Sequence, residues 1–190
     1  MECKWNDCDC TEINGKSTFE RHVLFHAFHT KLKNIGKNVL DSYNNLKARK
    51  SLNDDAQTSE QSSTISNTLV KCNLDEQTRN SIPELPFEFA CSWNTCEYIT
   101  NNPEAFYRHI RESHIDKMSA AEIKTSNMTC MWSECEQRIA NKDRLVEHMR
   151  HHSQEKLAAC PNCGALFASF TKFIDHCSRS SETKSYFFLN

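Results

Sequence analysis

The chain has 190 residues, of which 11 are cysteine, 9 are histidine and only 3 are glycine. So few glycines leave no phosphate-cradling loop, and the formal net charge of −2 is unusual for a dedicated DNA-binding protein, whose surface is normally basic. The sequence has no signal peptide, no apolar stretch long enough to cross a membrane and no catalytic constellation, so we expect neither a membrane protein nor an enzyme.

One pattern occurs three times: two cysteines around a tryptophan, followed by two histidines. Its residues are Cys3, Cys8, His22 and His26; Cys91, Cys96, His109 and His114; and Cys130, Cys135, His148 and His152. This spacing is typical of C2H2 zinc fingers, in which a turn carries two thiolates and a helix presents two imidazoles on one face. Such a tetrahedral site is closed, so the zinc would fold the unit and have no catalytic role.

The predicted fold is therefore a set of small zinc-stabilised ββα units, which are tandem C2H2 zinc fingers joined by flexible linkers. An apolar residue lies three positions before each first histidine, namely Phe19, Phe106 and Leu145. A unit of this size cannot bury enough apolar surface to fold alone, so the metal must supply the difference.

A fourth unit is predicted to be degenerate. Cys160, Cys163 and His176 follow the finger spacing, but no second histidine stands at or near Ser180. Cys177 directly follows His176, so a helix would point it away from the metal; water or a ligand from outside the chain is an equal alternative. We therefore expect Zn²⁺ as the cofactor, with three complete sites and a fourth that is incomplete.

Some cysteines and histidines lie outside these patterns. We interpret Cys10 and Cys72 as spare residues, and we regard His29 and His151 as alternative ligands because each lies near helical spacing from a chosen one. Metal is favoured over disulfides by the spacing, so the expected compartment is reducing.

Composition and spacing suggest how the chain is organised. Residues 51–80 are rich in polar side chains and are predicted to be disordered. Seven residues join the third and fourth fingers, which should behave as a pair, whereas 15 residues separate the second from the third. The predicted boundaries are finger 1 at 1–29, an amphipathic helical extension at 30–50, a disordered linker at 51–85, finger 2 at 89–114, finger 3 at 128–152, a degenerate finger 4 at 158–181 and a tail at 182–190.

The helix of the first finger is expected to continue past its histidines. Its apolar stripe consists of Phe28, Leu32, Ile35, Val39, Tyr43 and Leu46, whose spacing is helical. Gly36 weakens the prediction of an unbroken helix. The stripe either packs back on a finger or is a docking surface for another protein.

Several segments resemble the histone nuclear factor P family, which are zinc-finger transcription factors of replication-dependent histone genes. They are residues 21–33, 78–86, 102–109, 154–168 and 171–176. The resemblance implies a nuclear, sequence-specific DNA-binding activator of histone gene transcription at the onset of S phase. Further fingers follow in that family, so the end at Asn190 suggests a truncated form of a longer protein.

Helix positions −1, 3 and 6 of a docked finger reach successive bases in the major groove. The candidate DNA-binding residues at these positions are Arg21, Asn102, Arg108, Asn141, Arg144 and Lys172. An arginine can bind guanine and an asparagine can bind adenine. For Arg21 and Arg108, an equal alternative is that they are solvated surface residues or contact phosphates. The expected partner is double-stranded DNA, bound by a monomer.

Two other functions compete with this interpretation. The first is a protein-interaction module that recruits a transcriptional co-regulator. The slightly negative net charge of the chain favours this alternative. The second is RNA binding, and its only support is the irregular spacing of the fingers. The tryptophan of each finger is expected to pack finger against finger rather than to stack on bases.

Overall fold

The computed structural model describes residues 1–5, 8, 10, 12–54, 69–74, 86–119 and 128–182. The chain divides into two compact units. The composite unit combines Met1–Pro83 with Lys156–Asn190, and the central unit is Glu84–Glu155. The third and fourth cysteine/histidine repeats therefore belong to different units, and their behaviour as a pair stays a prediction.

The central unit contains two small ββα modules in sequence. The first consists of β1 (Phe89–Ala90), β2 (Ile99–Thr100), α2 (Pro103–His109) and the π-helix η2 (Ile110–Ile115). The second consists of β3 (Met128–Thr129), β4 (Arg138–Ile139) and α4 (Lys142–Ser153). Each pair of strands is antiparallel, with Ala90 opposite Ile99 and Thr129 opposite Arg138.

Asparagine side chains determine where the two α-helices of the central unit begin. The Oδ1 atom of Asn102 accepts a hydrogen bond from the backbone N–H of Ala105 at 3.0 Å, and Asn141 does the same for Arg144 at 2.9 Å. Each bond satisfies one of the N–H groups that the first helical turn leaves without a partner. Pro103, at the start of α2, needs no such partner.

The π-helix compensates for an irregular histidine spacing. His109 and His114 are five residues apart, whereas the other histidine pairs are four apart. An α-helix turns once every 3.6 residues, so it would rotate His114 past His109, but a π-turn, with its i→i+5 bonds, realigns them. Asp116 donates such a bond to the carbonyl of Arg111 at 2.8 Å, and the two histidine Nε2 atoms lie 3.2 Å apart.

The two modules of the central unit share one core. Their cysteine turns meet as a short antiparallel bridge between Trp93 and Trp132. Two backbone bonds hold this bridge, from Asn94 N–H to the Met131 carbonyl at 2.7 Å and from Ser133 N–H to the Ser92 carbonyl at 2.8 Å. Packing of module against module at the tryptophans therefore agrees with the expectation, although fifteen intervening residues had suggested that the two would be independent.

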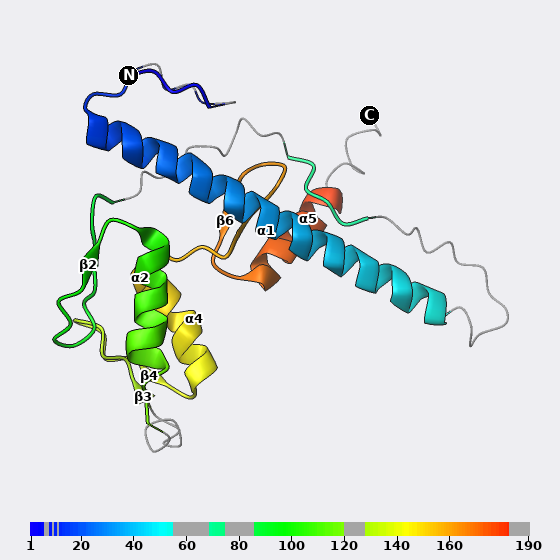
Figure 1. The fold of residues 1–190 in the computed structure, drawn as a ribbon. Helices are drawn as coiled ribbons and strands as arrows, with labels where there is room; N and C mark the ends of the chain where they lie inside the picture. Colours follow the sequence, from blue (N-terminus) through cyan, green and yellow to red (C-terminus); the bar gives the residue numbers. More distant parts are fainter. Residues whose placement is uncertain are drawn as a thin grey trace, which may run out of the picture. The chain divides into compact units, whose positions relative to one another are not determined.

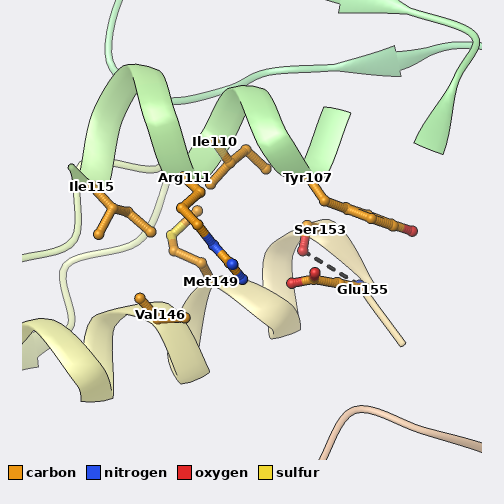
Figure 2. A pocket seen from close by; sticks show the side chains of 8 residues that line it. All are labelled: Tyr107, Ile110, Arg111, Ile115, Val146, Met149, Ser153 and Glu155. Carbon is orange, nitrogen blue, oxygen red and sulfur yellow. Dashed lines mark hydrogen bonds between the residues drawn. The ribbon is translucent and has the colours of Figure 1, made fainter. Parts of the chain in front are cut away.

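The helices of the two modules also pack together. Figure 2 shows Ile110 and Ile115 of η2 facing Val146 and Met149 of α4. Ile110, Ile115 and Met149 are all buried, so the contact is a closed apolar seam with Arg111, Tyr107, Ser153 and Glu155 at its rim.

The composite unit is built on one long helix, α1 (Lys16–Asp54), which packs against β5 (Ala158–Ala159) and α5 (Phe170–Glu182) (Figure 1). β5 pairs with β6 (Leu166–Phe167), so the fourth repeat is also a ββα module. The first repeat differs from the predicted fold, because in the described part of residues 1–15 no strand precedes α1. In the part of the chain that the structure describes, no helix is long and apolar enough to cross a membrane.

The buried face of α1 is rotated relative to the predicted stripe. It consists of Phe25, His29, Leu32, Gly36 and Leu40, whereas Tyr43 and Leu46 are exposed. Leu40, with Ile35 and Val39 beside it, joins the core of the fourth repeat around Phe173. The helix thus packs on a repeat more than a hundred residues later in the sequence (His29 and Gly164 are 135 residues apart).

Gly36 permits this packing and does not interrupt the helix. A Cβ atom at this position would overlap the backbone carbonyl oxygen of Ala159 and lie 3.4 Å from the Phe173 ring. A backbone atom cannot move aside as a flexible side chain would. Close approach of α1 to β5 therefore requires glycine here.

We expect Gly36→Ala to destabilise the composite unit by about 1–3 kcal/mol, because overpacking outweighs the gain of about 1 kcal/mol in helix propensity. Chemical denaturation followed by circular dichroism measures this change. Asn34→Ala is the control, since Asn34 is exposed on the same helix and its replacement should be neutral or slightly stabilising. A more stable Gly36→Ala variant would show that α1 does not approach β5 this closely.

Candidate metal centres

Four groups of four side chains bring their sulfur and nitrogen atoms within 4.8 Å of one another. Three of these groups are the sets predicted from spacing: Cys3, Cys8, His22 and His26; Cys91, Cys96, His109 and His114; and Cys130, Cys135, His148 and His152. In each set the cysteines lie on the turn and the histidines on the following helix. All twelve residues predicted for the first three repeats are therefore brought together, and each group can hold a metal ion.

The distances within these groups suit a shared central ion. The Cys8 sulfur lies 3.3 Å from Nε2 of His22, and the Cys135 sulfur lies 3.4 Å from Nε2 of His148. In the first group His26 Nε2 is 3.0 Å from that of His22. Donor atoms at these separations surround a point that each could reach, as tetrahedral zinc requires.

The tryptophan of each of the first three repeats stacks on the second histidine of its own group. The ring centroids of Trp5 and His26 lie 5.1 Å apart, with 6° between the planes. Trp93 stacks on His114 at 5.3 Å and Trp132 on His152 at 5.1 Å, again with nearly parallel planes. The tryptophan therefore fixes the orientation of one imidazole, which is the part of a metal site that neighbouring residues usually control.

The fourth group contains a residue that the sequence analysis missed. Cys160, Cys163 and His176 are joined by Cys72, which comes from the segment predicted to be a disordered linker. Cys72 is buried, with 2% of its surface exposed, so its interpretation as a spare residue is wrong. The expectation of an incomplete fourth set is corrected accordingly.

The apolar pattern around Cys72 could have revealed it. Residues 69–74, which we call the strap, carry four apolar side chains within a polar stretch, and Val70 and Cys72 are both buried. Ser180, where a second histidine had been sought, is buried, and its hydroxyl donates to the carbonyl of His176 at 2.7 Å.

The other spare residues are not members of the four groups. Cys10 and His151 are exposed, and Cys10 agrees with its interpretation as a surface residue. His29 is buried, and its Nε2 donates to the Gly164 carbonyl at 2.8 Å, which ties α1 to the fourth repeat. The interpretation of His29 and His151 as alternative ligands is therefore wrong for the described structure.

Electrostatics favours a cation at these sites. Burial raises the pKa of Cys91 and Cys130 to about 11 and that of Cys163 to about 12, because a buried thiolate without a counter-charge is unfavourable. Burial lowers the pKa of His109 and His148, which keeps the imidazoles neutral and able to donate a lone pair. A divalent ion would stabilise the thiolates, and thiolate and imidazole donors in a tetrahedral set suit Zn²⁺.

The predicted DNA-binding residues lie mostly on the surface. Five are exposed, namely Asn102, Arg108, Asn141, Arg144 and Lys172, while Arg21 is half-buried. The Oδ1 atoms of both asparagines are occupied as helix caps. Arg144 donates to the Glu147 carboxylate at 2.9 Å, an exposed ion pair.

Small ββα modules with clustered cysteine and histidine donors define this molecule as a protein built from metal-binding modules. Over 183 residues it is 36% identical to the histone H4 transcription factor of Bos taurus and 35% identical to that of Homo sapiens. Each match covers 95% of this chain but 31% of the relative, so the chain spans about a third of the length of these proteins. No protein-family model matches the chain. The similarity is consistent with the resemblance to the histone nuclear factor P family.

Proposed function

We propose that the chain is a zinc-dependent, sequence-specific DNA-binding regulator of transcription that acts in the nucleus on histone genes, at the onset of S phase. The observation that carries the proposal is the similarity, over 95% of the chain, to two proteins named histone H4 transcription factor. The cysteine/histidine groups support it, because C2H2 zinc fingers closed by Zn²⁺ are a common means of presenting helices to the major groove.

Among the candidate base-reading residues, the basic ones are favoured over the asparagines. A bidentate contact to adenine requires both the Oδ1 and Nδ2 atoms of asparagine, and Oδ1 of Asn102 and Asn141 already caps a helix. Arg144 is easier to redirect, because an exposed ion pair contributes only about 0–1 kcal/mol. Guanine would offer its guanidinium two acceptors in place of Glu147.

Selection of bound DNA from a random pool, with the zinc-loaded protein, tests this function. Enrichment of one motif that contains guanine is the expected result. Failure to enrich any motif, from protein that carries its zinc, would contradict sequence-specific binding.

With the selected site in hand, we expect Arg144→Ala to weaken binding by about 1–3 kcal/mol and to relax the preference at one base pair. Lys156→Ala is the matched control. It removes a charge from the short segment before β5, where a phosphate contact would affect all sequences alike. Fluorescence anisotropy with specific and scrambled duplexes measures both. Equal losses on the two duplexes for Arg144→Ala would mean that Arg144 does not read a base.

A protein-interaction module remains the second candidate function. The observation that favours it is a pair of exposed apolar side chains one turn apart on α1, Tyr43 (39% exposed) and Leu46 (59% exposed). A co-regulator protein could bind such a surface while the monomer binds DNA. Failure of the DNA selection, combined with capture of a defined co-regulator that Leu46→Glu abolishes, would favour this function.

A further inference from the structure

The fourth metal-binding group takes its donors from two parts of the chain that are far apart in sequence. We propose that Cys72 is the fourth ligand of a Cys3His zinc site, together with Cys160, Cys163 and His176, and that this zinc fastens the strap to the module formed by β5, β6 and α5. The ligand atoms of all four residues lie within 4.8 Å of one another, and the Cys163 sulfur is 3.4 Å from Nε2 of His176.

The Cys72 sulfur has the same backbone hydrogen bond as one cysteine in each of the second, third and fourth groups. The backbone N–H of Leu74, two residues on, points to the Cys72 sulfur at 3.4 Å. The N–H two residues on donates equally to sulfur in Cys91, Cys130 and Cys163, from Trp93, Trp132 and Ala165 respectively. Hydrogen bonds to sulfur stabilise a thiolate, so Cys72 is prepared for coordination in the way that the predicted ligands are.

Polar contacts hold the strap in place on both sides of Cys72. The side chain of Asn44 on α1 pairs with the backbone of Val70 in both directions, at 3.0 and 2.9 Å. The Cys72 carbonyl accepts from Nδ2 of Asn162, which lies between the two cysteines of the fourth repeat, at 2.6 Å. Beyond it, Asn73 donates to the Ser180 carbonyl at 3.3 Å. The strap is therefore positioned by α1, the cysteine turn and α5 together.

Cys177 is the rival ligand, and its position argues against it. It is fully buried and forms a side-chain contact with Cys160. However, it directly follows His176, so the helix turns it about 100° away from the face that carries the imidazole. It does not belong to the group of four converging donors. Cys177 therefore packs beside the site and does not complete it.

Two valine substitutions separate coordination from packing. Cys72 and Cys177 are buried in the same apolar core, and valine preserves an apolar side chain of similar size at either position. We expect Cys72→Val to weaken zinc binding at the fourth site by more than about 100-fold, because loss of even an outer-shell partner costs about 10- to 100-fold. Cys177→Val should leave the zinc affinity of the fourth site within a few-fold of the wild-type affinity.

The measurement is zinc affinity and stoichiometry of the 190-residue chain, by competition with a chromophoric chelator and by native mass spectrometry. Wild type and Cys177→Val should each carry four zinc ions, and Cys72→Val three under the same competition. Four retained ions in Cys72→Val, or equal losses in the two variants, would overturn the proposal.

A second measurement uses the unmodified chain, so it does not depend on how a variant folds. Cobalt(II) replaces zinc, and its thiolate charge-transfer absorption grows with the number of coordinating sulfurs. The wild-type chain should contain three centres with two thiolates and one with three. A spectrum that fits two thiolates at every centre would also overturn the assignment of Cys72.

Discussion

Removal of zinc by a strong chelator is expected to unfold the three ββα modules and to separate the strap from the fourth repeat. Structural zinc contributes on the order of 10 kcal/mol of folding free energy per site, which exceeds what cores of this size supply. Each tryptophan stacks on a histidine of its group, so tryptophan fluorescence should report the loss of all three tryptophan-containing sites. Circular dichroism should report the loss of the module helices.

Restoring zinc in excess of the chelator is the control and should recover both signals. Magnesium added in the same amount should not, because it prefers oxygen donors and octahedral geometry. Fluorescence and circular dichroism that do not change after chelation, with metal analysis showing no zinc left, would mean that the metal does not stabilise these modules.

Phe173→Ala is expected to destabilise the composite unit by about 3–5 kcal/mol. Its side chain is completely buried and packs with Leu40 of α1 and Val70 of the strap, so truncation leaves a cavity where three segments meet. Denaturation of the zinc-loaded chain measures the loss, and hydrogen exchange locates it in α1 and α5.

Phe170→Ala is the matched control, since Phe170 lies three residues earlier on α5 and is 42% exposed. Its truncation should cost far less than that of Phe173. The central unit has its own core, so its hydrogen exchange should change in neither variant. Equal destabilisation by the two substitutions would contradict the packing of α1 and the strap on the fourth repeat.

Local spacing was sufficient to predict most members of the four cysteine/histidine groups. Cys91 and Cys96 share one turn, and His109 and His114 share one helical segment. The four side chains come together through local backbone structure, which the sequence spacing describes. The same reasoning did not reveal the π-helix, because a five-residue histidine spacing only shows that a regular α-helix would misalign the rings. The structure shows that the π-turn brings both imidazoles into the group with Cys91 and Cys96.

Contacts between distant segments could not be predicted from spacing. Asn162 bonds to the carbonyl of Cys72 across 90 residues, and no local pattern links the two. Gly36 was read as a weakness in a helix because propensity describes an isolated helix, whereas here it allows close contact with Ala159. Similarly, the fifteen residues between the second and third repeats suggested that these repeats are independent, but burial of Trp93 and the apolar seam at Met149 join them.

Binding of the selected DNA site as a function of zinc tests the central claim most directly. Anisotropy of a labelled duplex would be recorded with zinc-loaded protein, after chelation and after zinc is restored. The account predicts tight binding to the selected site, loss of the preference over a scrambled duplex on chelation, and recovery with zinc. A preference that persists after the zinc has been removed, or that never exceeds binding to the scrambled duplex, would contradict it.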